Sequence, residues 1–175
     1  LPLLLVAACG EKPVAVPPPP TAASKAADGI HWVNGDVEAA FASAKAQNKP
    51  VILYWGAEWC PPCHQLQATV FSRPDFIAKS KLFIPVYLDG DQEGAQKWGE
   101  QFKVTGYPTI VILDSERREV MRIAGGMDLS LYANVLDQAL GNLQPVSDIF
   151  AIAARGEKLT SAQCQGRAYN GGVRG

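Results

Sequence analysis

The sequence has little net charge, few cysteines and no long apolar run. It holds 16 basic and 17 acidic residues, a formal net charge of −1, without a basic stripe interleaved with aromatic residues. That balance gives no basis for nucleic-acid binding or for steering of acidic substrates. Four cysteines in 175 residues are too few for a miniprotein held together by disulfides. The apolar stretch at residues 1–9 is too short for a membrane-spanning helix, which needs about 20 residues.

The sequence does contain enough apolar material for one folded domain. Hydrophobic residues make up 47% and charged residues 19% of the chain, as in ordinary globular proteins. The length favours one domain with appended segments, and there is no internal repeat. We expect the folded domain over residues 30–141. Residues 142–175 are then a helical and irregular tail that the sequence cuts short.

Residues 1–9 are typical of the end of a signal peptide. The run Val6-Ala7-Ala8-Cys9 resembles the bacterial lipobox, in which the chain is cut before a cysteine that becomes lipid-modified. The resemblance implies a lipoprotein of the bacterial cell envelope, facing the periplasm and attached to the membrane through Cys9. The alternative is an ordinary secretory signal, or an apolar tail with an incidental cysteine.

Residues 10–29 contain four consecutive prolines at 17–20 and lack a periodic apolar face. Consecutive prolines favour an extended polyproline II conformation of about 3 Å per residue. We interpret this segment as a linker between a lipid anchor and the folded domain. The alternative is a leader without a role.

Hydrophobic periodicity predicts alternating helices and strands. After the N-cap candidate Asp36, apolar residues recur at helical spacing, and a continuous apolar run at 51–55 is typical of a buried strand. Early alternation implies right-handed β-α-β units, and a late strand pair implies an antiparallel edge. We predict an α/β fold with a mixed central sheet of about four strands flanked by helices. The further expected elements are helices at 60–70, 92–102, 129–140 and 145–154, and strands at 82–88, 109–113 and 119–124.

Cys60-Pro61-Pro62-Cys63 follows a predicted strand and opens a predicted helix. A thiol at a helix N-terminus faces unpaired N–H groups and the positive end of the helix dipole, which favour the reactive thiolate. The spacing allows the two sulfurs to alternate between a dithiol and a disulfide. We interpret Cys60 as the attacking thiol at an exposed first turn, and Cys63, one turn deeper, as the resolving thiol.

The two prolines bear on the reduction potential of this pair. Proline suits the first helical turn, where its missing N–H has no partner within the helix. Pro61 and Pro62 also remove two hydrogen-bond donors near the Cys60 sulfur and leave the N–H of Cys63. A less stabilised thiolate favours a more reducing pair.

Two segments carry a family resemblance. Residues 55–63, Trp-Gly-Ala-Glu-Trp-Cys-Pro-Pro-Cys, resemble the active-site segment of thioredoxins, and Gly-Tyr-Pro-Thr at 106–109 resembles the second signature of that family. The resemblance implies a thioredoxin fold and a thiol–disulfide oxidoreductase that needs no dissociable cofactor. It also implies a cis Pro108 facing the dithiol, and a substrate groove formed with Trp59 and Tyr107. The alternative for Pro108 is a trans proline that opens a strand.

Residues 69–76 are similar to a segment of periplasmic thioredoxin-like domains, including the C-terminal domain of the membrane thiol:disulfide interchange reductase. This similarity implies a reductase of the cell envelope. Its partners would be protein disulfide substrates and an upstream electron-donor protein. The sequence leaves open whether the protein reduces, oxidises or isomerises disulfides.

The sequence departs from the thioredoxin pattern at one position. Thioredoxins usually carry a buried acid six residues before the first cysteine, where this chain has Tyr54. Glu58 or a water molecule would then accept the proton of the resolving thiol, and Glu58 is otherwise a surface charge near the groove. His64 is expected on the helix surface, with tuning of the dithiol as the second interpretation.

Three alternatives remain for the Cys60–Cys63 motif. With His64 it matches C-x-x-C-H, the haem attachment pattern of c-type cytochromes, and Met121 or Met127 would be the second axial ligand. Zinc would need ligands beyond one C-x-x-C pair, with His31 and Cys164 as distant nominees, so no metal site is expected. The third alternative is a redox-inert binding module. Cys164 itself is expected to be an incidental thiol or the partner of a cysteine beyond this sequence.

Overall fold

The computed structural model describes residues 29–125, 134, 137–138, 146–161 and 163–164. The expected helix at 129–140 therefore lies almost wholly outside the described residues. The elements in chain order are β1 (Val33–Asn34), α1 (Val37–Gln47), β2 (Val51–Gly56), α2 (Pro61–Leu66), the π-helical turn η1 (Gln67–Phe71), α3 (Pro74–Ser80), β3 (Ile84–Asp89), α4 (Glu93–Gln101), β4 (Thr109–Leu113), β5 (Glu119–Ala124) and α6 (Val146–Ala154).

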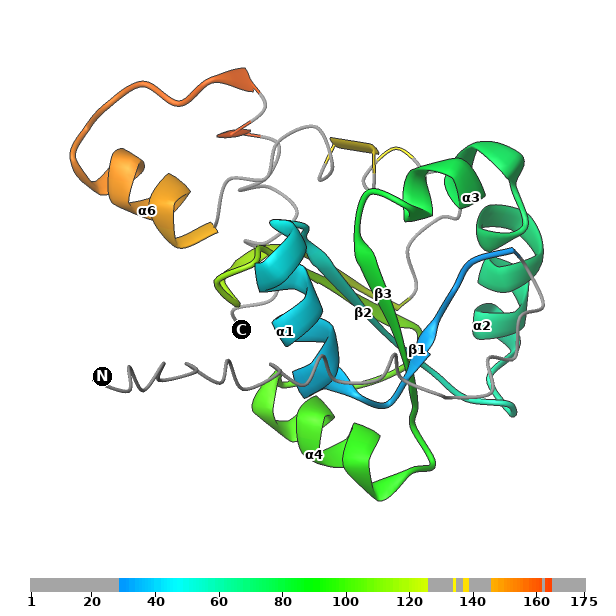
Figure 1. The fold of residues 1–175 in the computed structure, drawn as a ribbon. Helices are drawn as coiled ribbons and strands as arrows, with labels where there is room; N and C mark the ends of the chain where they lie inside the picture. The colour runs from blue at the N-terminus through cyan, green and yellow to red at the C-terminus, as the bar shows by residue number, and fades with distance from the viewer. Residues whose placement is uncertain (1–28, 126–133, 135–136, 139–145, 162, 165–175) are drawn as a thin grey trace, which may run out of the picture.

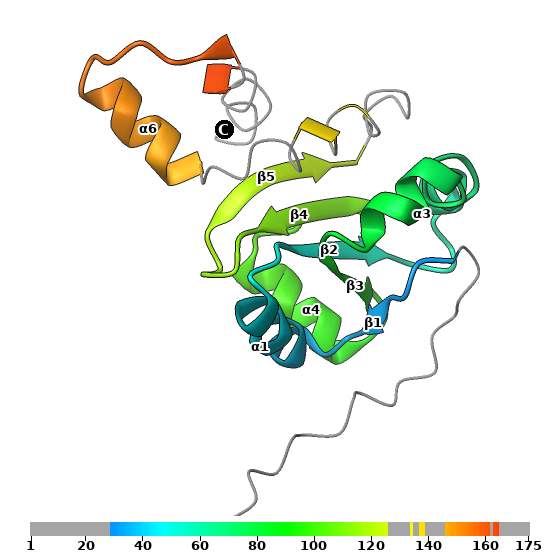
Figure 2. The same cartoon turned by 45° about the horizontal axis from the view of Figure 1, so that its top comes forward.

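The strands form one mixed sheet in the order β1-β3-β2-β4-β5 (Figures 1 and 2). β3 runs parallel to β1 and β2, whereas β4 runs antiparallel to β2 and β5. The predicted α/β architecture and antiparallel edge are confirmed. The sheet has five strands rather than about four because the two-residue strand β1 pairs with Val86 and Tyr87 of β3. That pairing joins segments far apart in the sequence. β1 itself, with two residues, is too short to show a periodic pattern.

Helices cover both faces of the sheet, with α1 and α4 on one face and α2 and α3 on the other (Figure 1). All residues of β2 are buried. Because successive strand side chains point to opposite faces, Leu53 and Trp55 pack with α1 and α4, whereas Ile52 and Tyr54 pack with α2, η1 and α3. The continuous apolar run of β2 thus reflects a strand buried on two sides.

Local signals define both ends of α1, and the predicted N-cap is confirmed. The side chain of Asp36 accepts a hydrogen bond from the N–H of Ala39 at 3.0 Å, as an N-cap residue does. Asn48 ends the helix in the left-handed conformation, with φ 49° and ψ 47°. α3 was not predicted, although Pro74 at its first position is a recognised signal for a helix start.

The tail contains the predicted helix, observed as α6. Arg118 links it to the turn before β5, because its guanidinium donates to Asp148 of α6 at 3.2 Å and also binds Asp114. Within the described ranges, no helix is long and apolar enough to cross a membrane.

Candidate active site

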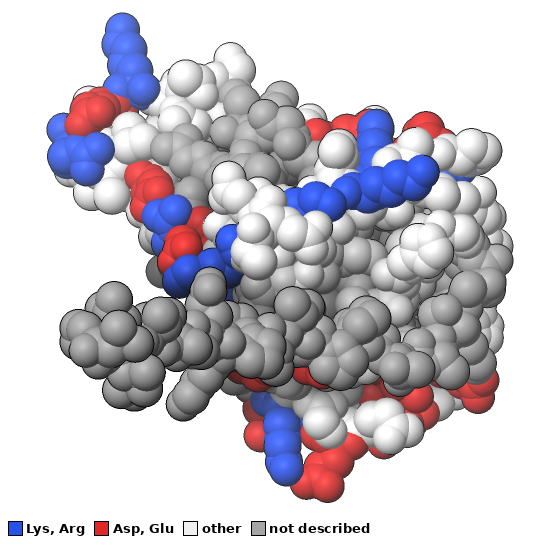
Figure 3. All heavy atoms as spheres, in the orientation of Figure 1, with Lys and Arg blue, Asp and Glu red and all other residues white. Residues whose placement is uncertain are grey.

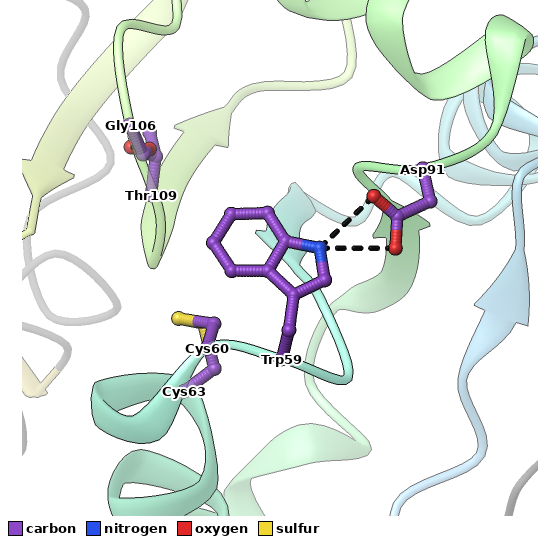
Figure 4. The surroundings of a disulfide bond; sticks show 6 residues. All are labelled: Trp59, Cys60, Cys63, Asp91, Gly106 and Thr109. Carbon is purple, nitrogen blue, oxygen red and sulfur yellow. Dashed lines mark hydrogen bonds between the residues drawn. A yellow bond between two sulfur atoms is a disulfide. The ribbon is translucent and has the colours of Figure 1, made fainter.

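Cys60 and Cys63 are joined by a disulfide bond at the start of α2, with their Cα atoms 5.3 Å apart (Figure 4). They are three positions apart in the sequence, with Pro61 and Pro62 between them, which places the second sulfur one helical turn behind the first. The structure therefore confirms that the two sulfurs lie within bonding reach. In the view of Figure 4, the disulfide lies below the loop that carries Gly106 and Thr109, and the ring of Trp59 lies beside it.

The two cysteines differ in exposure less than the sequence predicted. Cys60 is 3% exposed and Cys63 is 0% exposed, so the expectation of an exposed Cys60 is wrong in degree, although the order is correct. The physical reason is tertiary. Both cysteines pack with Ala57, and Tyr107 comes from the loop before β4 to cover the same cluster.

The backbone at the start of α2 is arranged around the two prolines. Cys60 is the N-cap residue in an extended conformation, and the prolines fill the first two helical positions. The N–H of Cys63 donates to the carbonyl oxygen of Cys60 at 3.0 Å. The N–H of Cys63, the donor that the two prolines leave near the Cys60 sulfur, is therefore already bonded to a carbonyl oxygen. This agrees with a sparsely stabilised Cys60 thiolate.

The loop opposite the disulfide contains the predicted cis peptide bond between Tyr107 and Pro108. The hydroxyl of Thr109 donates to the carbonyl oxygen of Gly106 at 2.7 Å and closes this loop. A Cβ atom at Gly125 would lie 3.2 Å from the carbonyl oxygens of Tyr107 and Pro108. Glycine at this position therefore lets the chain after β5 approach the loop closely.

Trp59 is the most exposed aromatic residue of the site, at 65%. Its indole N–H donates to both carboxylate oxygens of Asp91, at 3.0 and 3.1 Å, and its ring centroid lies 6.0 Å from that of Tyr107 (Figure 4). The structure thus brings Trp59 together with Tyr107, as the resemblance implied, and adds Asp91. Sequence reasoning missed Asp91. The available signal was the parallel pairing of β2 and β3, which places the residues after both strands at one edge.

Tyr54 stands at the position where thioredoxins usually carry a buried acid, and a second tyrosine, Tyr87, packs against it. Tyr54 is 1% exposed and packs its ring against Tyr87, with centroids 5.6 Å apart. Burial, followed by the charge of Asp89, raises the pKa of Tyr87 to about 12. Burial also raises the pKa of Tyr107, with Asp91 as the next cause. Both groups therefore stay protonated near neutral pH.

Glu58 and His64 are exposed, as the surface interpretation of both residues predicted. Both line a pocket of about 660 Å³ beside the active-site loop. Their proposed influence on the dithiol stays a prediction.

Of the two methionines nominated as haem ligands, the structure describes one. Met121 is 4% exposed and lies in the core on β5, and Met127 is outside the described residues. Over the described part of the chain, no group of three or more His, Cys, Asp or Glu side chains is placed to hold a metal ion. Cys164 is an exposed thiol. Cys9 lies outside the described residues.

Comparison with known proteins defines the class of this site. The Thioredoxin-like domain family matches residues 37–140, which is more than half of the chain. A solution structure of a thioredoxin from Thermus thermophilus superposes with a TM-score of 0.54 and 26% sequence identity, covering 63% of this chain and 93% of that one. The chain therefore belongs to the thioredoxin-like family, and the predicted thioredoxin fold is confirmed.

Curated relatives carry disulfide-exchange names. Over 97 residues the chain is 27% identical to the thiol:disulfide interchange protein DsbD 2 of Pseudomonas aeruginosa, covering 53% of this chain and 16% of that protein. It is 26% identical over 113 residues to the disulfide bond reductase DsbH of Chlamydia pneumoniae, covering 56% of this chain and 64% of that protein. The chain thus spans less than two thirds of either relative. The predicted similarity to interchange proteins is confirmed at the level of the domain.

Proposed function

We propose that this protein reduces disulfide bonds in other proteins of the bacterial cell envelope, using Cys60 and Cys63 as its redox pair. The observation that carries the proposal is the disulfide at the start of α2, beside the cis Tyr107–Pro108 loop and the exposed ring of Trp59. The names of the relatives, an interchange protein and a disulfide bond reductase, support the same chemistry. The dithiol is itself the redox group, so no dissociable cofactor is required.

The reaction begins with the reduced pair. The Cys60 thiolate attacks one sulfur of the substrate disulfide, which forms a mixed disulfide and releases a substrate thiolate that takes up a proton. Cys63 then loses its proton and attacks the Cys60 sulfur, which releases the second substrate thiol and forms the Cys60–Cys63 bond. The substrate gains two electrons and two protons, and the pair becomes oxidised. A dithiol electron-donor protein then reduces the Cys60–Cys63 disulfide and regenerates the dithiol.

The assignment of roles follows from position. Cys60 is the N-cap residue of α2 and retains some exposure, whereas Cys63 is fully buried one turn behind. A thiolate at the N-cap is stabilised by the positive end of the helix. Trp59, Tyr107 and Pro108 would form the groove for the extended segment around the substrate cysteine. The proton of Cys63 would pass to Glu58 or to water, since Tyr54 stands where family members usually carry an acid.

The test is a pair of cysteine variants assayed with a protein disulfide substrate. We expect Cys60→Ser to abolish turnover, and Cys63→Ser to accumulate a mixed disulfide that mass spectrometry detects. Absence of turnover in the wild-type protein would instead favour a redox-inert binding module. Absorbance of a covalent haem in the purified protein would contradict the proposal altogether.

The direction of electron flow is tested by redox titration against glutathione. We expect a potential near that of thioredoxin, about −270 mV, because the prolines leave few donors for the thiolate. A potential close to about −120 mV, as in strong periplasmic oxidants, would exclude the reductase assignment.

We also propose that a lipid on Cys9 anchors the protein, with residues 10–29 as a tether facing the periplasm. Expression in a bacterium with labelled fatty acid should label the wild-type protein and leave Cys9→Ser unlabelled. Retention of Cys9→Ser in the membrane fraction with unchanged labelling would refute the anchor.

A further inference from the structure

A pocket of about 660 Å³ lies beside the active-site loop, and its volume falls in the range of sites that hold small groups. Ala57, Glu58 and His64 form part of its wall. These residues flank the disulfide in the sequence, whereas neither cysteine lines the pocket. A side chain held in the pocket would therefore lie near a substrate that is bonded to Cys60, outside the groove proposed at Trp59 and Tyr107.

Four aromatic rings belong to the pocket lining: Trp32, Tyr54, Phe71 and Tyr87. They form one connected cluster. Trp32 lies 5.6 Å from Tyr54 and 5.2 Å from Phe71, measured between ring centroids. Tyr54 lies 5.0 Å from Phe71 and 5.6 Å from Tyr87. Tyr54 and Phe71 are each 1% exposed, so the half-buried rings of Trp32 and Tyr87 supply most of the accessible aromatic surface. Ring faces carry partial negative charge, so this lining favours a cation.

The charged residues of the lining have the same sign. Glu58 and Asp89 are acidic, and the lining contains no lysine or arginine. Both carboxylates, together with Asp91, contribute to the raised pKa of Tyr87, so their charges act at the aromatic cluster itself. Figure 3 shows acidic side chains gathered along the lower edge of the molecule, where Figure 1 places α4. The other titratable group of the lining is His64, which is exposed.

The backbone gives an independent indication. Gln67 and Phe71, the first and last residues of the π-helical turn η1, both line the pocket. π-helical turns are uncommon and occur frequently at functional sites. Here the turn sets the spacing of two lining side chains on a helix that begins at the disulfide.

We propose that this pocket receives a lysine or arginine side chain of the substrate protein, close to the disulfide that Cys60 attacks. This inference rests on the proposed function and adds a preference for disulfides with a basic neighbour. A cation in the pocket gains attraction from the aromatic faces and from Glu58 and Asp89. A neutral side chain would gain no attraction from these charges, and an acidic one would be repelled by both carboxylates.

The experiment uses peptide disulfides that differ at one position. Arginine is compared with citrulline, its uncharged isostere, at successive positions on either side of the cysteine, and stopped-flow fluorescence follows oxidation of the reduced protein. We expect the arginine peptide to react about tenfold faster at its best position, a value in the range of a desolvated cation–π contact. The advantage should shrink in high salt because ions screen the carboxylates.

Variants assign the effect to the pocket. We expect Asp89→Asn to bring the arginine-to-citrulline rate ratio close to one; asparagine can still accept the hydrogen bond from the N–H of Asp91. Trp32→Leu should lower the same ratio by removing one ring. Glu100→Gln, on the exposed side of α4, removes one negative charge elsewhere and should keep the ratio.

The outcomes separate the two proposals. Equal rates for arginine and citrulline at every position, with both peptides reduced, would overturn the pocket and leave the proposed function intact. Reaction with neither peptide would overturn the proposed function. A full arginine preference in folded Asp89→Asn would show that the preference arises outside this pocket.

Discussion

The indole nitrogen of Trp59 and the carboxylate of Asp91 are joined by two hydrogen bonds, although 32 positions separate them in the sequence. Trp59 directly precedes the reactive cysteine, and Asp91 follows β3. Since β2 and β3 are parallel neighbours, the two loops meet at one edge of the sheet. The contact therefore fixes the orientation of an exposed ring that would otherwise rotate freely beside Cys60.

Removal of this acceptor should disturb substrate binding more than folding. We expect Asp91→Ala to slow exchange with protein disulfides by about fivefold, since an exposed hydrogen bond to a charged group is worth about 1 kcal/mol. Asp91→Asn keeps one acceptor and should have a smaller effect. Stopped-flow rates measure the change, and the indole N–H resonance of Trp59 reports the contact. Equal rates for all three proteins would show that the contact does not position the ring.

A small residue is required at Gly90, because a Cβ atom there would overlap the ring of Tyr107. We expect Gly90→Ala to displace this ring, to slow exchange and to lower the free energy of unfolding by about 1–3 kcal/mol, as overpacking does. The matched control is Gly94→Ala in α4, where nothing lies within 4 Å of the added atom. Alanine in that helix should be neutral or stabilising. Chemical denaturation and peptide exchange assays on both variants test the difference.

Stability should fall at high pH through Tyr87. Its pKa in the folded protein is about 12, whereas tyrosine in an unfolded chain has a pKa of about 10. Between these values the folded protein binds more protons than the unfolded chain, so the free energy of unfolding falls as pH rises. The free energy of unfolding of the Tyr87→Phe variant should fall less steeply over the same pH range. Urea midpoints from pH 9 to 12 measure this, and identical slopes for both proteins would contradict it.

Trp55 connects β2 to α4 through the hydrogen bond from its indole N–H to the carbonyl oxygen of Ala95, at 3.0 Å in the buried core. We expect Trp55→Phe to lower the free energy of unfolding by about 2 kcal/mol, from the lost bond and the smaller ring. The half-buried Trp98 provides the comparison, and Trp98→Phe should cost less than about 1 kcal/mol. Denaturation curves measure both variants, and equal losses of unfolding free energy for Trp55→Phe and Trp98→Phe would refute this prediction.

The parts of the fold that were predicted from the sequence are those with local signals. The apolar run of β2, the cap at Asp36 and the Cys60–Cys63 spacing each identify an element within a few residues. β1 was missed because two residues carry no periodicity and are defined by their pairing with β3. α3 was missed although Pro74 marked its start.

The sequence predicted which residues belong to the site but not how they pack against one another. Resemblance identified Trp59, Tyr107 and Pro108. The structure packs Tyr107 against the two cysteines and contains the cis bond before Pro108, and the groove itself stays a prediction. The near-complete burial of Cys60 depends on how Tyr107 packs across the sheet, which no local pattern encodes. The contact with Asp91 and the aromatic pocket depend on the packing of distant elements in the same way.

The small exposure of Cys60 determines the order of events in the proposed cycle. Only 3% of Cys60 is exposed, so in the proposed function the electron donor and the substrate would reach its sulfur in turn. We therefore expect the protein to exchange disulfides with one partner at a time, each presenting its cysteine on a protruding loop. Steady-state rates with both partners varied should then give the parallel double-reciprocal lines of a ping-pong scheme.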